Sequence, residues 1–249
     1  MTYKKKKHKG LLIGLTLFLI VVGCVVLAFF IYVGSYYKAT DHALSYLQDT
    51  ERVDVSEEDD YISFVPKNQE ATDCGFIFYP GGKVVTEAYA PLMASLADQG
   101  ITSYILRMPF HLAFFATNAA EKVYSSNISN WYIGGHSLGG AAAASYVSNH
   151  TDLYKGFVLL ASYSTEDMSS SSLKTLSLLG SNDKILNQDN YNKNKSHLAN
   201  LTEVTISGGI HSYFGDYGHQ DGDGVASISY EEQEQAIVDN VSSFILEKN

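Results

Sequence analysis

The stretch WYIGGHSLGG, Trp131–Gly140, decides the fold. The apolar segment Asn130–Ile133 predicts a buried strand, and the small-residue segment Leu138–Val147 predicts a helix directly after it. Gly135–Gly139 between them fits the pattern G-x-S-x-G, which is typical of a sharp strand-to-helix turn that exposes a serine hydroxyl above a sheet. Side chains at the two outer positions of so tight a turn would collide with its neighbours, which explains the glycines. Ser137 is therefore the predicted nucleophile.

Strand and helix signals alternate through the rest of the chain. The predicted strands are a polar edge strand around Val53 and Val55, then Tyr61–Val65, Gly75–Tyr79, Ile101–Leu106, Gly156–Ala161, Leu173–Leu179 and Leu201–Ile206. The predicted helices are Thr86–Gln99, with its regular part starting at Pro91, and Tyr230–Leu246, with a capping box from Ser229 and Glu232. Largely apolar strands that alternate with helices indicate an α/β fold with a mostly parallel sheet flanked by helices.

The base that would activate the serine should lie downstream. A serine hydroxyl is a weak nucleophile until a base takes its proton, and behind this kind of turn an acid and then a histidine follow along the chain. His211 closely follows the strand Leu201–Ile206, in a loop that belongs at the carboxyl edge of the sheet, and is the preferred base. His219 is the second choice. His150 and His197 lie in polar or helical surroundings and are less suitable.

The acid should follow the strand before that one. Asp183 leaves the strand Leu173–Leu179 through a short turn, where it could hold the imidazole tautomer and stabilise the charged imidazole. Aspartate is also common as a turn or N-cap residue, and this structural alternative stays open. Asp189 is the fallback. Three further aspartates, Asp216, Asp221 and Asp223, follow His211 and would break the expected order.

An oxyanion also needs hydrogen-bond donors, and two are expected from the backbone. The N–H of Leu138, at the start of the helix, is the expected first donor. The second should come from the glycine-containing loop after the strand Gly75–Tyr79. Gly82 and Lys83 are both candidates there, and the sequence does not choose between them.

A substrate pocket is predicted from the apolar segment PFHLAFF that follows the strand Ile101–Leu106. Phe110, His111, Phe114 and Phe115 would line it, with His136 of the turn as a wall residue. Core packing under a loop is an equally good interpretation of the same segment.

Composition excludes several classes of function. Hydrophobic residues make up 45% of the 249 residues and charged residues 18%, which is neither disordered nor fibrous. Of the 17 Lys and Arg residues, five precede the first apolar run, which leaves 12 against 27 Asp and Glu, a formal net charge of −15. Such a domain repels phosphate backbones, so we expect no nucleic-acid partner. No spacing typical of a metal site or a nucleotide fingerprint occurs, so no metal and no cofactor are expected.

The N-terminus predicts a membrane anchor. Residues 11–33 carry no charge and are long enough to span a hydrocarbon core of about 30 Å. The lysines of residues 1–10 place the N-terminus in the cytoplasm and the rest of the chain outside, as a single-pass protein of the cell membrane. A juxtamembrane stalk over residues 34–52 and an extracytoplasmic domain over residues 53–249 follow. A lipoprotein processed at Cys24, a cleaved signal peptide and a buried core helix are the alternatives.

These motifs together resemble a known family. The matching segments are FIFYPGGKV (Phe76–Val84), RMPFHLAFF (Arg107–Phe115), WYIGGHSLGG, LLGSNDKI (Leu178–Ile185) and GGIHSYFGDYG (Gly208–Gly218). The chain resembles the α/β-hydrolase family 5 group of bacterial esterase-like proteins, which are distantly similar to dienelactone hydrolases. The resemblance implies an α/β-hydrolase fold with a minimal cap and a triad of Ser137, Asp183 and His211. Members with one N-terminal anchor look like cell-surface proteins of Gram-positive bacteria.

The expected activity is hydrolysis of an acyl ester, small or lipid-like, through an acyl-enzyme on Ser137. Amide or peptide hydrolysis in the cell envelope is an alternative, because the same triad serves both reactions. A surface binding module that keeps the fold without catalysis is another. The sequence does not give the natural substrate or the oligomeric state.

Overall fold

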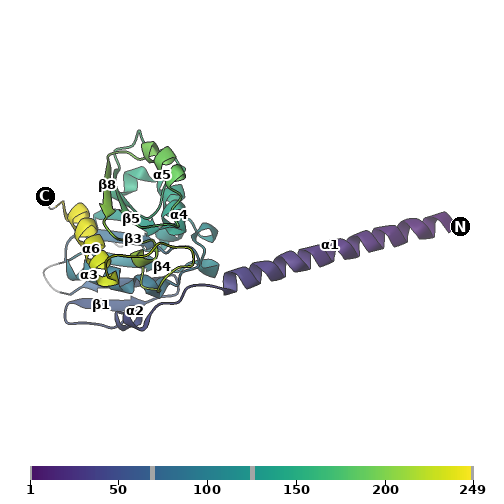
Figure 1. Ribbon diagram of the computed structural model, residues 1–249, viewed down its shortest axis with the longest axis horizontal. Helices are drawn as coiled ribbons and strands as arrows, with labels where there is room; N and C mark the ends of the chain where they lie inside the picture. Colours follow the sequence, from purple (N-terminus) through teal and green to yellow (C-terminus); the bar gives the residue numbers. More distant parts are fainter. Residues whose placement is uncertain (1, 68–70, 124–126, 248–249) are drawn as a thin grey trace. The chain divides into compact units, whose positions relative to one another are not determined.

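The computed structural model describes residues 2–67, 71–123 and 127–247, without the side chains of residues 2–9 (Figure 1). The chain divides into two compact units, Met1–Tyr36 and Tyr37–Asn249. Each unit is described by itself below.

The first unit is one long helix, α1 (Thr2–Gly34). Its segment Gly10–Gly34 contains an 18-residue window with a mean hydropathy of 3.0 and is long and apolar enough to cross a membrane, a property that signal sequences share. In the basic tail expected over residues 1–10, Met1 lies outside the described residues and the lysine side chains are not described.

The second unit is built on one sheet, in which the described residues form eight strands in the order β1-β2-β4-β3-β5-β6-β7-β8. β1 and β2 pair antiparallel, β2 joins β4 antiparallel, and all other neighbours are parallel. The predicted mostly parallel α/β sheet is thereby confirmed. The strands are β1 (Val53–Glu57), β2 (Tyr61–Pro66), β3 (Cys74–Tyr79), β4 (Thr102–Leu106), β5 (Asn130–His136), β6 (Gly156–Leu160), β7 (Lys174–Gly180) and β8 (Leu201–Ile206).

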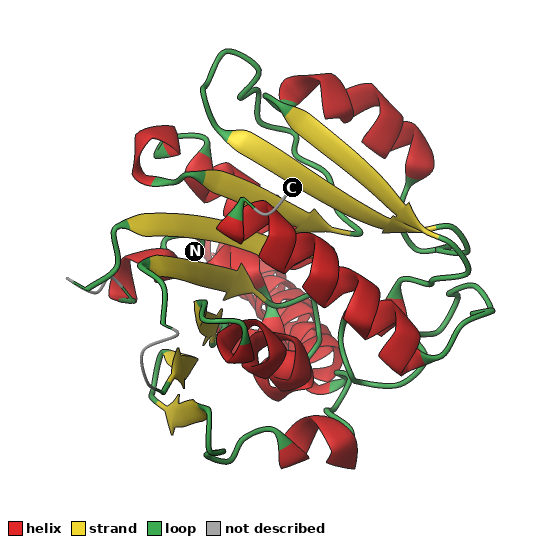
Figure 2. Ribbon diagram, turned by 90° about the vertical axis from the view of Figure 1, so that its left-hand side faces the viewer, coloured by secondary structure: helices red, strands yellow, loops and turns green. Residues whose placement is uncertain are grey.

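Helices cover both faces of this sheet (Figure 2). α3 (Ala90–Asp98) and α6 (Tyr230–Leu246) pack together on one face, over a core that includes Phe76, Phe78 and Val241. α4 (Leu138–Val147) packs on β3, β5 and β6, beside a second core. The other helices are short: α2 (Asp41–Ser45), α5 (Gln188–Asn194), η1 (Thr86–Tyr89), η2 (Pro109–His111), η3 (Ala113–Phe115), η4 (Ala119–Lys122), η5 (Thr151–Leu153), η6 (Lys195–His197) and η7 (Ser212–Phe214).

Local signals place several helix ends correctly. The segment predicted as one helix from Thr86 starts as a 3₁₀ turn and becomes α-helical at Ala90, with Pro91 in its first turn. The capping box of α6 is present: the Ser229 hydroxyl accepts from the N–H of Glu232, whose carboxylate accepts from the N–H of Ser229. By contrast, α5 lies in an asparagine-rich stretch that gave no helix signal. The side chain of Asn187 caps it.

The segment expected as a stalk, residues 34–52, divides between the two units. From Tyr37 onward it belongs to the compact second unit. The N–H of Tyr37 donates to the carbonyl of Lys83 at 2.7 Å, and its carbonyl accepts from the N–H of Val85 at 3.1 Å. Ala43 of α2 is fully buried. The chain is therefore bound to the domain well before the first strand begins.

Candidate active site

The candidate site begins at the turn between β5 and α4, where Ser137 has φ 51° and ψ −122°. Its N–H donates to the carbonyl of Leu160 at 3.0 Å, and its carbonyl accepts from the Ser162 hydroxyl at 2.6 Å. A Cβ on Gly139 would lie 2.2 Å from the carbonyl oxygens of Tyr79 and Pro80. Only glycine lets the turn approach β3 so closely, and these contacts hold Ser137 in a conformation that L-residues rarely adopt.

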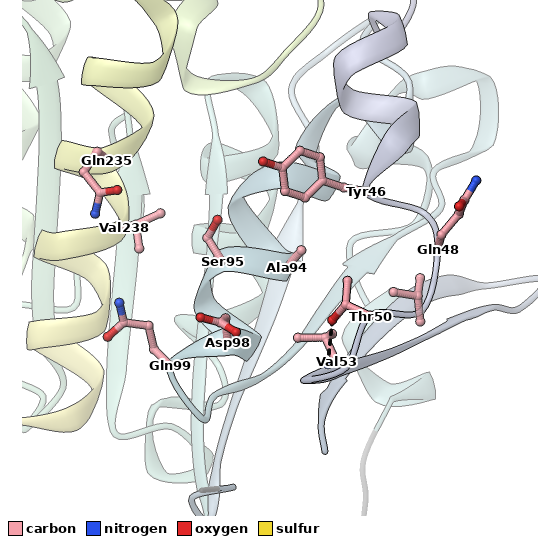
Figure 3. Close-up of a pocket in the computed structure, with 11 residues that line it drawn as sticks. Tyr46, Gln48, Thr50, Val53, Ala94, Ser95, Asp98, Gln99, Gln235 and Val238 are labelled. Carbon is pink, nitrogen blue, oxygen red and sulfur yellow. Dashed lines mark hydrogen bonds between the residues drawn. The ribbon is translucent and has the colours of Figure 1, made fainter. Parts of the chain in front are cut away.

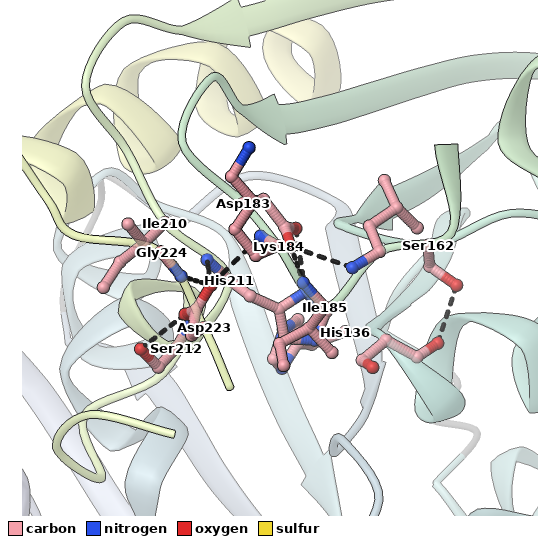
Figure 4. A network of polar contacts seen from close by, with 12 residues as sticks. His136, Ser162, Asp183, Lys184, Ile185, Ile210, His211, Ser212, Asp223 and Gly224 are labelled. Carbon is pink, nitrogen blue, oxygen red and sulfur yellow. Dashed lines mark hydrogen bonds and ion pairs between the residues drawn. The ribbon is translucent and has the colours of Figure 1, made fainter. Parts of the chain in front are cut away.

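His211 and Asp183 form a buried pair beside this turn. Nδ1 of His211 lies 2.8 Å from Oδ2 of Asp183, and the two residues are 1% and 6% exposed. They come from two loops at the carboxyl edge of the sheet, after β8 and β7 (Figure 4). A carboxylate only accepts hydrogen bonds, so the proton of the neutral imidazole sits on Nδ1 and Nε2 keeps its lone pair.

The second oxygen of the Asp183 carboxylate has other partners. Oδ1 accepts the N–H groups of Ile185 and Leu186, each at 2.8 Å. Asp183 therefore organises its own turn and also contacts the imidazole.

Ser137 and His211 line one cavity of about 210 Å³. Nε2 of His211 is buried, and no hydrogen-bond partner for it exists among the described residues. The cavity walls also include Leu138, Ala141, Ala161, Ser162, Tyr163, Ile185, Leu186 and Asn187. A carbonyl carbon held in this space would have a hydroxyl and an imidazole acceptor on its borders.

His136 lies beneath this site and is fully buried. The hydroxyl of Tyr89 accepts the N–H of Gly81 at 2.9 Å and lies 2.9 Å from Nδ1 of His136. The rings of His136 and His211 are 4.6 Å apart between centroids. Burial, together with the nearby His211, holds the pKa of His136 well below its usual value. The ring is therefore a neutral support for His211, and it does not line the cavity.

The backbone geometry separates the two candidate donors for the oxyanion. Gly82 and Lys83 form a turn closed by the N–H of Val84 on the carbonyl of Gly81, at 3.2 Å. The N–H of Lys83 donates to the carbonyl of His111 at 2.7 Å, so the expectation that Lys83 could hold the oxyanion is corrected. Gly82 lies against Leu138: a Cβ on it would be 2.6 Å from Cδ2 of that leucine. Of the two residues of this turn, Gly82 is the one that lies beside Leu138.

The predicted pocket segment does not enter the cavity. Phe110, Phe114 and Phe115 are 46%, 53% and 56% exposed, and neither they nor His111 are among the cavity's lining residues. The apolar walls come instead from the start of α4 and from the loops after β6 and β7. Pocket lining and core packing were the two alternatives for this segment, and its three phenylalanine side chains neither line this cavity nor lie in the core.

Asp223 is the neighbour of the site that sequence reasoning missed. Its carboxylate accepts from the N–H groups of His211 at 3.3 Å, Ser212 at 2.7 Å and Lys184 at 3.3 Å (Figure 4). Although burial opposes ionisation, hydrogen bonds led by the N–H of Ser212 hold its pKa below the usual value. A Cβ on Gly224 would lie 1.8 Å from the carbonyl oxygen of Asn182, so the sequence Gly-Asp-Gly was the available signal of a close approach.

The other candidates from the sequence lie apart from the pair. Nε2 of His219 lies 3.0 Å from the carbonyl of Gly224, and His150 stacks on Tyr146 with its Nδ1 2.8 Å from that residue's carbonyl. Asp189 is in the first turn of α5. His197 belongs to η6.

A second hollow lies between β1, α3 and α6 (Figure 3). It has a volume of about 290 Å³ and includes Tyr46, Asp98 and Gln235 among its walls. Its described lining holds no histidine or cysteine. In the part of the chain that the structure describes, no group of three or more His, Cys, Asp or Glu is arranged to hold a metal ion.

Comparison with solved structures gives the same fold. Est1E from Butyrivibrio proteoclasticus superposes with a TM-score of 0.55 at 15% identity, over 79% of this chain and 98% of its own. An esterase from Pyrobaculum calidifontis gives 0.56 at 14%, over 82% and 89%. A dienelactone hydrolase-like promiscuous phosphotriesterase from metagenomic libraries gives 0.57 at 15%, over 78% and 97%. At such identities the likeness establishes the fold alone.

The sequence itself matches a family. Among proteins of curated function, none matches the chain. The model of the alpha/beta hydrolase family matches residues 75–235, which is more than half of the chain and includes Ser137, Asp183 and His211. The order of strands, the sharp turn after β5 and the buried pair at the carboxyl edge agree with that match. The chain belongs to the alpha/beta hydrolase family.

Proposed function

We propose that this protein is a serine hydrolase that cleaves a carboxylic ester. The observation that carries the proposal is the buried pair of Asp183 and His211. Nε2 of His211 has no hydrogen-bond partner among the described residues, and His211 lines the same cavity as Ser137. A buried acceptor without a partner is costly in a folded protein, and such groups belong to sites where a ligand or substrate completes the bond.

The reaction proceeds by acyl transfer to water in two steps. The Ser137 hydroxyl attacks the ester carbonyl while Nε2 of His211 takes its proton, and that proton then passes to the departing alcohol. Water, activated by the same nitrogen, hydrolyses the acyl-enzyme. Asp183 holds the proton of the imidazole on Nδ1 and stabilises the charged ring.

Charge on the carbonyl oxygen is balanced by the N–H groups of Leu138 and Gly82. Leu138 is the first residue of α4, so its N–H has no partner within the helix and adds to the positive end of the helix dipole. His136 stays neutral beside the imidazole that becomes charged, which avoids repulsion between the two rings.

We also propose that residues 11–33 anchor the enzyme in the cell membrane, with the N-terminus in the cytoplasm and the hydrolase domain outside. The length and hydropathy of residues 11–33 and the five lysines before residue 10 support this. The full-length chain should stay in the membrane at its unprocessed mass, and Cys24→Ala should behave identically. Loss of the first 23 residues with a lipid on Cys24 would replace the anchor by a lipoprotein.

A fluorophosphonate probe tests the catalytic proposal. Wild-type protein should be labelled on Ser137, and Ser137→Ala and His211→Ala should lose labelling while their circular dichroism and melting temperature show a folded domain. His219→Ala is the matched control and should keep its labelling. Absence of labelling in folded wild-type protein would reject the proposed nucleophile.

The ester class is tested by a substrate panel. Matched esters and amides with the same acyl group should show turnover of the esters and much slower turnover of the amides. Equal or faster amide cleavage would assign the enzyme to the amidases.

A further inference from the structure

Three phenylalanines are exposed within six residues of the second unit. Phe110, Phe114 and Phe115 lie on the consecutive turns η2 and η3, with exposures of 46%, 53% and 56%. Single exposed apolar residues are common, whereas a cluster of large aromatic side chains marks a surface that meets an apolar partner. We call the segment Phe110–Phe115 the aromatic loop.

The backbone holds this loop in a strained conformation. Phe110 and His111 both have a backbone φ of 55°, a value that residues other than glycine rarely adopt. The carbonyl of His111 accepts from the N–H of Lys83 at 2.7 Å, and the N–H of Leu112 donates to the carbonyl of Pro109 at 3.0 Å. Strain of this kind persists where the surroundings enforce it, and it concentrates at functional surfaces. The exposure of the phenylalanines is therefore a property of an ordered turn.

The loop lies next to the residue at which the second unit begins. Lys83 links the two: its N–H donates to His111, and its carbonyl accepts from the N–H of Tyr37 at 2.7 Å. α1 ends at Gly34, so two residues separate it from Tyr37. The three residue steps from Gly34 to Tyr37 span at most about 11 Å, whatever the arrangement of the two units. An anchor in α1 therefore keeps this part of the domain within reach of the bilayer surface.

The net charge of the chain does not favour contact between the domain and a bilayer. The chain after residue 10 has a formal net charge of −15 and repels anionic headgroups. Attraction to a bilayer must then come from apolar side chains, and aromatic rings are suited to the interfacial region. Lys83 also adjoins Gly82, which lies against Leu138 at the cavity, so the aromatic loop and the site share one edge of the domain.

We propose that the aromatic loop inserts into the surface of the bilayer that holds α1, so that the Ser137 cavity receives an amphiphilic ester from the membrane. This inference rests on the proposed anchor and deepens the proposed hydrolase activity by naming its substrate class.

Fluorescence quenching tests the insertion without relying on activity. The chain contains one tryptophan, the buried Trp131, which stays in place as a constant background. Phe114→Trp places a reporter on the loop. Leu153→Trp is the matched control, since Leu153 is 51% exposed and lies on η5, before the amino end of β6, whereas Ser137 lies after the carboxyl end of β5. Both full-length variants are reconstituted in phosphatidylcholine vesicles with or without brominated acyl chains.

The reporter on Phe114 should be quenched at least twofold more strongly than the reporter on Leu153, and added salt should not reduce the difference. Equal quenching of the two, or none, would overturn the insertion. A retained melting temperature identifies variants that are folded.

Turnover tests the substrate class. Phe114→Ser should lower, by about tenfold, the ratio of turnover on an ester embedded in the vesicles to turnover on a soluble short-chain ester, because one large apolar contact is lost. An unchanged ratio would overturn the membrane supply of substrate. The two proposals can fail separately: missing fluorophosphonate labelling with strong quenching rejects the hydrolase alone, and labelling without quenching rejects the insertion alone.

Discussion

Oδ2 of Asp183 lies 2.8 Å from Nδ1 of His211, while Oδ1 of the same carboxylate is held by two backbone N–H groups. Asp183→Asn should therefore lower kcat strongly, although asparagine and aspartate have nearly the same shape. The amide oxygen must stay on the two N–H donors, so the amide NH₂ faces Nδ1 and forces the imidazole proton onto Nε2. We expect kcat to fall by about 10³- to 10⁴-fold with little change in KM.

Steady-state kinetics on a soluble ester check this prediction, with a thermal melt to show that the turn is intact. Asp189→Asn is the control and should keep its kcat. A variant Asp183→Asn that retains a tenth of wild-type kcat would remove Asp183 from the proposed triad.

The conformation of Ser137 predicts an unusual order of stability. Its φ of 51° is unfavourable for any residue with a Cβ. Ser137→Gly should therefore be more stable than Ser137→Ala by about 1 kcal/mol, because glycine adopts this conformation more readily. Ser148 has φ −57°, so Ser148→Gly should be less stable than Ser148→Ala. Urea unfolding of the four variants measures both differences, and the same sign at both positions would contradict the strain.

The contribution of the Gly82 N–H to oxyanion binding can be tested by replacing Gly82 with proline, which has no N–H. With φ 61° at Lys83, the turn resembles type II, whose preceding position accepts proline. Gly82→Pro should slow ester turnover by about 10²- to 10³-fold through loss of one oxyanion donor. Gly82→Ala introduces a Cβ near Leu138 but keeps the N–H, and should retain much more activity. Equal losses in the two variants would attribute the effect to crowding.

Asp223 is expected to position the loops that carry His211 and Lys184. Asp223→Asn loses charge-assisted hydrogen bonds from both loops and should lower the free energy of unfolding by about 1.5–3 kcal/mol. The rate of fluorophosphonate labelling should fall as well, at temperatures where the variant is fully folded. Asp221→Asn, on the exposed neighbour, should change neither quantity. An unchanged labelling rate in folded Asp223→Asn would mean that Asp223 stabilises the fold but does not position His211.

Glu234 should make the protein less stable as the pH rises. Burial, with a smaller contribution from Asp216, raises the pKa of Glu234 from 4.5 to about 7. Between these values the folded state binds more protons than the unfolded state, so the free energy of unfolding falls as the pH increases. Below pH 4.5 the residue is protonated in both states and has no effect on this slope.

Glu234→Gln removes the titration and should raise the melting temperature at pH 8 relative to wild type, with little difference at pH 5. Asp239→Asn, on the exposed side of α6, should leave the pH profile unchanged. A wild-type profile that Glu234→Gln does not alter would refute the raised pKa.

The sequence alone predicted the strands and the longer helices because their signals are local. Apolar runs of strand length, the glycines around Ser137, the capping box at Ser229 and the start of the α-helix near Pro91 depend on neighbours within a few residues. The short α5 escaped prediction because it has no apolar face: the Asn187 side chain caps it, and its buried residues are Tyr191 and Asn194.

Contacts between distant segments were decided only by the tertiary structure. Gly82 and Lys83 looked equivalent in sequence, and the carbonyl of His111 distinguishes them from 28 positions away by occupying one N–H. The apolar character of Phe110 and Phe114 predicted burial, yet their strained turn exposes them. Asp223 seemed excluded by its place after His211, but folding brings its carboxylate to the backbone of both loops. Local patterns specify which strands and turns form, whereas hydrogen bonds and packing across the sheet edge decide which side chains meet.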